Sequence, residues 1–444
     1  MTEKSGTRSS VGLLDIASQV PGLLMDAPTI LRGVATGFLA RPSAKTSIGK
    51  VFQDRAARYS DKLFLKFDGR EITYGEANET VNRYAAVLAA RGVGHGDVVG
   101  IMLRNSVEPV LLMLAAVKCG AISGMLNYNE RDDVLKHSLG LLSASVVVAD
   151  TEFVEHISES GADTEGLLTL DELKQLAETA PATNPATTAA VLAKDKAFYI
   201  FTSGTTGMPK ASVMTHYRWL RALAGFGGLG MRLNSSDTLY CCLPLYHNNA
   251  LTVALSSVLK SGATLALGKS FSASKFWDDI IRYDATAFVY IGEVCTYLLG
   301  QPEKDTDRKH RVRVIAGNGL RPAIWDDFTD RFGIDRVCEF YAASEGNTAF
   351  VNVLNVDKTT GICPTPVAFV EYDESGDPVR DKDGRVRKVA NGEPGLLLSK
   401  VSNFQPFDGY TDKEATEKKL VRDAFKEGDV WFNTGDLMRS QGFG

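Results

Sequence analysis

The stretch FTSGTTGMPK, residues 201–210, combines residue types that suit the binding of an anion. Hydroxyl side chains donate hydrogen bonds, glycines let backbone N–H groups face a ligand without a Cβ in the way, and a lysine adds positive charge. The members of this loop are Ser203, Gly204, Thr205, Thr206, Gly207 and Lys210. An ordinary polar turn is the alternative, but this density of donors directly after the apolar run FYIF favours a phosphate-binding loop.

The loop does not follow the Walker pattern of P-loop nucleotide-binding proteins. The two glycines are too close together, Lys210 does not follow a glycine, and Ala211 stands where that pattern needs Ser or Thr. The following residues, ASVMT, predict a strand, and Thr215 predicts the N-cap of a helix that starts at His216. We therefore expect the loop to join two strands, whereas a Walker loop opens directly into a helix.

The elements around this loop alternate between apolar strands and amphipathic helices. TYGE at residues 73–76 has capping-box spacing and predicts a helix start, and Gly120 predicts the end of the next helix. Continuous apolar strands between helices are typical of parallel sheets covered on both faces. Strands are predicted within 97–103, 121–126, 143–150, 197–202, 238–244, 263–268, 285–292, 311–317 and 336–341.

This pattern predicts an α/β protein with two βα subdomains, whose mostly parallel sheets are covered by helices, and a smaller β-barrel-like subdomain near the C-terminus. The last part is inferred from Asp-Gly and Asn-Gly turns between short strands. The predicted divisions are residues 1–45, 46–185, 186–353 and 354–444. A Pro/Thr/Ala-rich connector at 178–190 is expected to be an exposed loop between the first two subdomains.

The longer stretch YIFTSGTTGMPKASVMTH closely resembles the AMP-binding signature of the adenylate-forming enzymes, which include acyl-CoA synthetases, luciferases and peptide-synthetase adenylation domains. Further motifs of that family follow in order: LPLYHNNA (243–250), GNGLRP (317–322), EFYAASEG (339–346) and FNTGDL (432–437). The resemblance runs from about residue 45 to the end of the chain. GNGLRP, YAASEG and LYHNN look most like the fatty-acid transport protein and very-long-chain acyl-CoA synthetase branch.

The resemblance implies a ligase that activates a fatty acid with ATP as acyl-AMP and then transfers the acyl group to coenzyme A. ATP, Mg²⁺ and coenzyme A are the implied cofactors and co-substrates. The residues implied to bind the nucleotide are Thr202, Ser203, Gly204, Thr205, Thr206, Gly207 and Lys210 at the phosphates, Gly317, Asn318, Gly319, Glu339, Phe340, Tyr341 and Ala342 around the base, Ser344 at the α-phosphate and Asp436 at the ribose.

The implied catalytic residues are Lys210, Glu345 and His247, and the implied magnesium ligands are Glu345 and Thr205. Each has a plainer alternative, because Glu345 and Asp436 also suit a surface loop and Tyr341 also suits a core. Their joint occurrence in the family order favours the site. His247 lies either at the acyl entrance near the carboxylate or at a helix N-terminus without a chemical role.

The LPLYHNNA motif indicates the substrate class by the residue type that it lacks. Residues 243–249 contain no acidic side chain, so the α-amine of a free amino acid would have no partner, and an apolar acid is favoured. Residues 250–263 and 287–300 are apolar and suit either a tunnel wall or a core. Two alternatives stay open: an acyl-AMP ligase that loads a carrier protein, and a protein that binds fatty acid and nucleotide without turnover.

Composition limits the partners and the compartment. The 444 residues carry a net charge of −5, which argues against nucleic acid as the main partner. Six cysteines without CxxC spacing predict reduced core thiols. Because the start of the chain lacks a signal-peptide pattern, we expect a cytoplasmic protein.

The two ends of the chain give two further expectations. Residues 11–42 predict short amphipathic helices that either pack on the core or lie on the inner face of the cell membrane. In the family, a hinge and a small C-terminal domain with a catalytic lysine follow the TGD motif. The resemblance therefore implies that this domain is absent, and that the chain binds its substrates but adenylates poorly.

Overall fold

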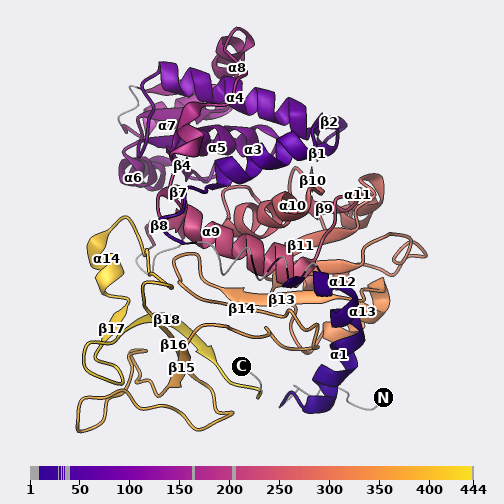
Figure 1. Cartoon of the computed structure of the whole chain (residues 1–444), viewed down its shortest axis with the longest axis vertical. Helices are drawn as coiled ribbons and strands as arrows, with labels where there is room; N and C mark the ends of the chain where they lie inside the picture. Colours follow the sequence, from indigo (N-terminus) through magenta and orange to yellow (C-terminus); the bar gives the residue numbers. More distant parts are fainter. Residues whose placement is uncertain are drawn as a thin grey trace.

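The structure is a computed structural model of the chain that describes residues 10–28, 30–31, 33, 35, 41–162, 166–202 and 207–442. Three sheets organise these residues (Figure 1). Ser203, Gly204, Thr205 and Thr206 of the predicted phosphate loop lie outside the described residues, as do parts of the 11–42 segment.

The first sheet has six strands and contains both strands that flank the phosphate loop. All neighbours are parallel except the last pair, which is antiparallel. In spatial order the strands are β6 (Leu167–Thr169), β5 (Val146–Ala149), β3 (Val98–Met102), β4 (Ile122–Met125), β7 (Lys196–Thr202) and β8 (Lys210–Thr215).

The second sheet has eight strands, six of them parallel, with an antiparallel strand at each edge. In spatial order these are β14 (Ala349–Val351), β13 (Val337–Ala342), β12 (Val314–Asn318), β11 (Ala287–Ile291), β9 (Thr238–Cys241), β10 (Thr264–Leu267), β1 (Leu63–Phe67) and β2 (Arg70–Thr73).

The third sheet is small and wholly antiparallel, in the region where turn residues predict short strands. In Figure 1 it lies below and to the left of β13 and β14. Its order is β15 (Val367–Val370), β16 (Gly395–Lys400), β18 (Val430–Met438) and β17 (Leu420–Arg422). The predicted α/β class, with two mostly parallel sheets and a smaller β-rich part, is confirmed.

Helices cover the large sheets, and one apolar core cluster contains side chains from both sheets and from the helices between them. The α-helices are α1 (Leu13–Met25), α3 (Ile48–Arg58), α4 (Tyr74–Ala90), α5 (Glu108–Cys119), α6 (Asp132–Leu142), α7 (Val154–Glu159), α8 (Leu170–Glu178), α9 (His216–Ala222), α10 (Leu255–Ser261), α11 (Phe276–Arg282), α12 (Val294–Leu299), α13 (Trp325–Phe332) and α14 (Lys413–Glu417). Short 3₁₀ turns are η1 (Thr151–Phe153) and η2 (Ala186–Ala189), and π-helices are η3 (Leu223–Met231) and η4 (Asn249–Ala254).

Local signals in the sequence placed several helix ends correctly. Thr73 is the N-cap of α4 and exchanges hydrogen bonds with Glu76 in a capping box. Gly120 ends α5 in the left-handed conformation. Thr215 caps α9, where its hydroxyl accepts a hydrogen bond from the backbone N–H of Arg218. Side-chain caps of this kind satisfy N–H groups that the first turn of a helix leaves without partners.

The division of strands between the two large sheets does not follow the order of the sequence. β1 and β2 precede the strands of the first sheet but join the second sheet, whereas β7 and β8 follow residue 185 and join the first. The subdomain limits given above therefore stay a prediction. The arrangement matters for the site, because Lys210 at the start of β8 lies near Tyr410, which bonds Glu345 in the turn after β13 of the second sheet.

A buried lysine ties the 178–190 connector to the first sheet. Lys118, near the end of α5, has no exposed surface, and its Nζ donates to the Oδ1 atoms of Asn78 at 2.6 Å, Asn82 at 2.8 Å and Asn184 at 2.8 Å. The Lys118 carbonyl accepts the hydroxyls of Thr187 and Thr188. Burial lowers the pKa of Lys118 to about 7. The connector is thus mostly exposed, as predicted, but anchored at one buried point.

Substitution of this lysine is predicted to destabilise the fold. In Lys118→Met the amide oxygen of Asn82 stays buried without its donor, which typically costs about 1–3 kcal/mol. Urea unfolding should therefore show a free energy of unfolding lower by about 2 kcal/mol. Lys50→Met is the matched control, because Lys50 pairs with Asp54 on the surface, where ion pairs contribute roughly 0–1 kcal/mol. Equal stability of both variants and wild type would contradict this role.

Candidate active site

The described ends of the phosphate loop have the predicted strand–loop–strand form. β7 and β8 pair antiparallel with Thr202 opposite Lys210, and the Thr202 hydroxyl donates to the Lys210 carbonyl at 3.4 Å. Gly207 has φ +85°, a conformation that favours glycine. The described ends of the loop therefore belong to two antiparallel strands, as the sequence predicts.

Lys210 is brought close to Glu345 through one tyrosine. The Lys210 Nζ lies 5.4 Å from the centre of the Tyr410 ring, and the Tyr410 hydroxyl donates to Glu345 Oε1 at 2.9 Å. Burial, together with the nearby Glu345 carboxylate, raises the pKa of Tyr410. The sequence reasoning missed Tyr410, because a tyrosine in a polar loop carries no local signal of its neighbours.

A half-buried guanidinium positions the segment around Glu345. Arg218, in the first turn of α9, donates to the carbonyls of Val213 at 2.5 Å and Ser344 at 2.9 Å, and to that of Gly346. Desolvation by burial lowers the pKa of Arg218, although an arginine stays charged near neutral pH. One cation thus holds both β8 and the 344–346 turn. No local pattern in the sequence indicates this role either.

The glycine turn at 317–319 is held by Glu339. Its Oε1 accepts the backbone N–H of Gly319 at 2.7 Å, and its Oε2 accepts the hydroxyl of Tyr290. A Cβ at Gly317 would lie 2.4 Å from the Tyr290 carbonyl oxygen, so the turn packs too closely for any side chain there. Burial raises the pKa of Glu339 to about 7.

The EFYAASEG and FNTGDL motifs are in direct contact. The hydroxyl of Tyr341, at the end of β13, donates to Asp436 Oδ2 on β18 at 2.5 Å. Burial, and then this carboxylate, raise the pKa of Tyr341. On the other side, the Asn249 amide donates to Asn318 Oδ1 at 3.0 Å, which joins the LYHNN motif to the glycine turn. The described parts of all five motifs therefore converge at one edge of the second sheet.

One of the predicted nucleotide residues, Phe340, points its side chain away from this edge. Phe340 is 3% exposed and its ring lies 4.8 Å from that of Phe226, whereas the buried Glu339 carboxylate faces the glycine turn. Because successive residues face opposite sides of a strand, Phe340 faces the side opposite to Glu339 and Tyr341. Tyr341 faces Asp436, and Ala342 is exposed. His247 is exposed just before η4, so both interpretations of its role stay open.

The chemistry of Glu345 suits a magnesium ion held together with phosphate. Among the described residues, no group of three or more His, Cys, Asp or Glu side chains is arranged to bind a metal. Mg²⁺ in nucleotide sites is commonly bound by one or two carboxylates plus phosphate oxygens and water, so the half-buried Glu345 fits this pattern. Thr205, the second predicted ligand, lies outside the described residues.

The fold and the converging motifs define a nucleotide-binding α/β enzyme. Residues 52–410 match the family of AMP-binding enzymes. Because the match covers most of the chain, this protein belongs to the AMP-binding enzyme family.

The relatives agree with this membership. The chain is 67% identical over 444 residues to the medium/long-chain-fatty-acid–CoA ligase FadD6 of Mycobacterium tuberculosis, covering 99% of this chain and 74% of the relative. It is 36% identical over 428 residues to the human long-chain fatty acid transport protein 1, covering 88% of this chain but only 65% of that relative. The resemblance to the transport-protein branch is confirmed.

Solved structures show the same fold. A Mycobacterium tuberculosis fatty acyl CoA synthetase aligns with a TM-score of 0.72 and 25% identity over 88% of this chain and 75% of that chain. An ATP-bound MatB from Rhodopseudomonas palustris aligns with a TM-score of 0.71 and 24% identity over 88% and 76% of the two chains. The second similarity shows the fold alone.

The buried Glu339 predicts a pH dependence of stability. Its folded-state pKa near 7 lies above the ordinary 4.5, so the folded state keeps a proton that the unfolded state loses. The free energy of unfolding should fall between about pH 4.5 and 7, by about 3 kcal/mol from this group. In Glu339→Gln, which keeps an acceptor for Gly319, that component should disappear. Urea unfolding across this range measures it, with the exposed Glu303→Gln as control. Parallel profiles for wild type and Glu339→Gln would contradict the assignment.

Proposed function

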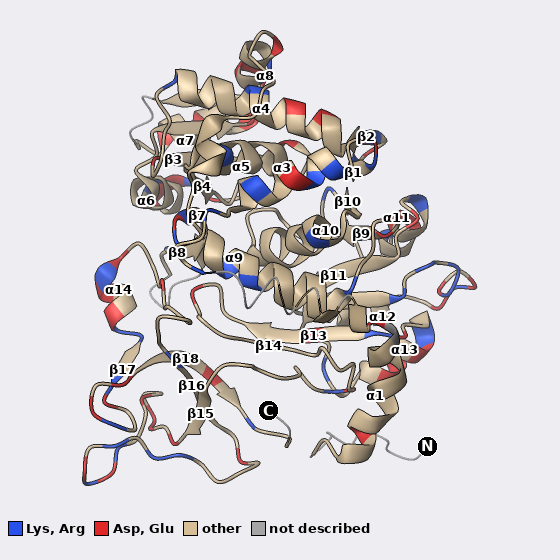
Figure 2. Cartoon of the chain, viewed as in Figure 1, with Lys and Arg blue, Asp and Glu red and all other residues tan. Residues whose placement is uncertain are grey.

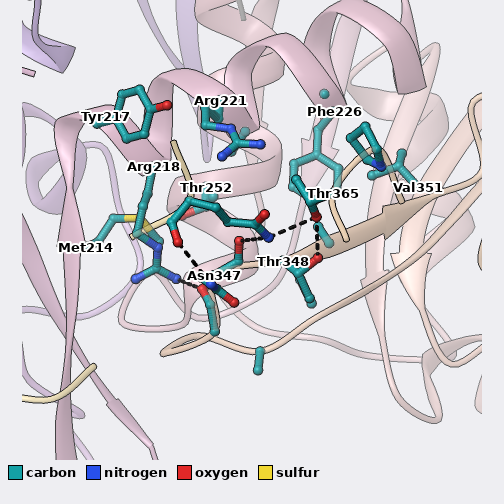
Figure 3. A pocket seen from close by; sticks show the side chains of 18 of the residues that line it. Met214, Tyr217, Arg218, Arg221, Phe226, Thr252, Asn347, Thr348, Val351 and Thr365 are labelled. Carbon is teal, nitrogen blue, oxygen red and sulfur yellow. Dashed lines mark hydrogen bonds between the residues drawn. The ribbon is translucent and has the colours of Figure 1, made fainter. Parts of the chain in front are cut away.

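We propose that this chain activates a medium- or long-chain fatty acid with ATP and transfers the acyl group to coenzyme A. The observation that carries the proposal is a cavity of about 230 Å³ that opens beside the Glu345 turn (Figure 3). Its wall includes Asn248 of the LYHNN motif. It also includes Ala342, Ala343 and Gly346 of the EFYAASEG motif. A space for an acid thus adjoins the groups proposed to hold the nucleotide.

The lining of this cavity suits an alkyl chain. Most of it is apolar, contributed by the α9–η3 helix, β14 and the residues around 362–364. The lining contains no Asp or Glu among the described residues, so the amine of an amino acid would have no partner there. Residues 287–300 do not line it, and their buried members pack in the two core clusters, which supports the core assignment for this stretch.

The reaction needs a site that tolerates several negative charges. A carboxylate oxygen attacks the α-phosphorus of ATP, the bond to pyrophosphate breaks, and acyl-AMP forms. The coenzyme A thiolate then attacks the acyl carbon, and AMP leaves. Lys210, the loop N–H groups and the Ser344 hydroxyl are proposed to stabilise the phosphates, which is the largest contribution expected in such a site. A bound Mg²⁺ would neutralise part of the polyphosphate charge.

The relatives favour this reading over the two alternatives. The ligase and the transport protein described above are named for fatty acids, and one of them for the transfer to coenzyme A. A carrier-protein acceptor or binding without turnover stays as an outcome of the assay. Acid-dependent exchange between ATP and pyrophosphate detects the first step, and thioester formation with coenzyme A or a carrier distinguishes the acceptors.

Nucleotide binding by this chain separates the proposed roles of Glu345 and Asp436. In Glu345→Ala, affinity for Mg·ATP should fall by about tenfold or more, because a charged ligand is lost, while affinity for AMP without magnesium stays unchanged. In Asp436→Ala both affinities should fall, because the ribose contact is common to both. Calorimetric titration measures this, with the exposed Glu414→Ala as control. Normal Mg·ATP binding and normal exchange in Glu345→Ala would remove its metal role.

We also propose that α1 rests on the inner face of the cell membrane. Among the described residues, no helix is long and apolar enough to cross a bilayer. α1 nevertheless exposes a row of leucines: Leu14 is 86%, Leu13 73% and Leu24 69% exposed. The helix carries one acidic and no basic side chain (Figure 2). The helix is continuous through Pro21.

Both ends of this segment are bonded to the rest of the protein. Asp26, the C-cap of α1, accepts from Arg232 at 2.7 Å and from Arg336 at 3.2 Å. The backbone N–H of Val11 donates to the Gln441 carbonyl at 2.7 Å. The leucines therefore point outward from an anchored helix, as expected of a surface helix that contacts lipid.

Removing these leucines should weaken membrane contact only. The variant with Leu13, Leu14 and Leu24 each changed to serine should co-sediment less with phosphatidylcholine–phosphatidylglycerol vesicles than wild type, with unchanged Mg·ATP binding. Leu176→Ser, at a leucine 44% exposed on α8, is the control and should co-sediment like wild type. If wild type does not sediment with vesicles, or if the triple variant sediments equally, lipid contact through α1 is excluded.

A further inference from the structure

The cavity beside Glu345 is bounded by a π-helix that contains four glycines. This helix, η3, has the sequence LAGFGGLGM and continues directly from α9. π-Helical turns are rare and occur frequently at functional sites, because they open the helix locally. The glycines are Gly225, Gly227, Gly228 and Gly230.

Three of these glycines are explained by close packing. A Cβ at Gly227 would lie 2.9 Å from the Lys260 Cβ, one at Gly228 would lie 2.7 Å from the Gly33 Cα, and one at Gly230 would lie 2.6 Å from the Cys338 Sγ. Contacts this short would force the neighbouring elements apart. These positions therefore need glycine for the fold.

Gly225 is different. No atom lies within 4 Å of a Cβ placed there, and Gly225 is one of the residues that line the cavity. Its φ is not positive, so the backbone itself does not require glycine. Glycine inside a helix costs roughly 0.5–1 kcal/mol relative to alanine, and no packing contact accounts for it here. The missing side chain instead leaves volume in the cavity.

The position of Gly225 places this volume away from the reacting end. Arg218, which bonds the 344–346 turn, lies at one side of the cavity in Figure 3, and Phe226 and Val351 lie at the other. Phe226 follows Gly225 directly and is fixed against Phe340. A chain whose carboxylate lies near the Glu345 turn would therefore extend past η3 toward β14.

We propose that Gly225 determines the length of acyl chain that the cavity accepts. The inference rests on the proposed function, because it assumes that the cavity holds the substrate alkyl group. A larger residue at this position fills the space that the distal methylenes of a medium or long chain would occupy. Short acids, which do not reach η3, keep their binding site.

The test is a chain-length series from hexanoate to palmitate, titrated calorimetrically into this chain and its variants. Gly225→Leu should lose affinity for the longest acids by about tenfold or more for each methylene excluded, while hexanoate binds as in wild type. Gly225→Ala should show a smaller shift in the same direction. Gly140→Leu is the matched control, because Gly140 lies in α6, is exposed and also has no atom within 4 Å of a built Cβ.

The outcomes separate this inference from the function on which it rests. If wild type binds no acid of any length, the assignment of the cavity fails. If wild type binds long acids and Gly225→Leu keeps the same length profile, or loses all lengths equally with normal Mg·ATP binding, the role of Gly225 is overturned. Should Gly225→Leu not fold, Gly225→Ala decides, because alanine favours the helix.

Discussion

The guanidinium of Arg218 is the interaction on which the site depends most. It donates to three backbone carbonyls, two of which belong to the turn that carries Glu345. An arginine is suited to this position because its planar, permanently charged fork donates in several directions at once. The same side chain lines the cavity that we propose for the acyl chain. The nucleotide residues and the cavity therefore share one rigid element, and neither is placed independently of the other.

All three sheets contribute elements to this arrangement. β8 carries the end of the phosphate loop and leads directly into α9, whose first turn contains Arg218. β13 of the other sheet carries Tyr341 and leads into the turn with Glu345. The small third sheet then supplies Asp436, whose carboxylate meets Tyr341 at 2.5 Å. Three sheets thus each contribute one part of the site, at the loops that follow their strands.

Much of this arrangement could be predicted from the sequence, where the signals are local. Apolar strand patterns, the capping box at Thr73 and the cap at Thr215 fixed the elements, and the motifs fixed their order. Contacts between distant residues could not be predicted in this way. Nothing near Lys118 in the sequence indicates its three asparagine partners, and nothing near Tyr410 indicates Glu345. The buried orientation of Phe340 follows from which face of β13 packs against Phe226, which the motif alone does not indicate.

The central claim is that the phosphate loop, the Tyr341–Asp436 pair and the apolar cavity form one site for an acyl-adenylate. A crystal structure of this chain with a non-hydrolysable fatty acyl-AMP analogue tests it most directly. The account predicts the ribose at Asp436, the base beside Tyr341 and the alkyl chain between η3 and β14. An analogue whose alkyl chain lies outside that cavity, or whose nucleotide lies away from Tyr341 and Asp436, would contradict it.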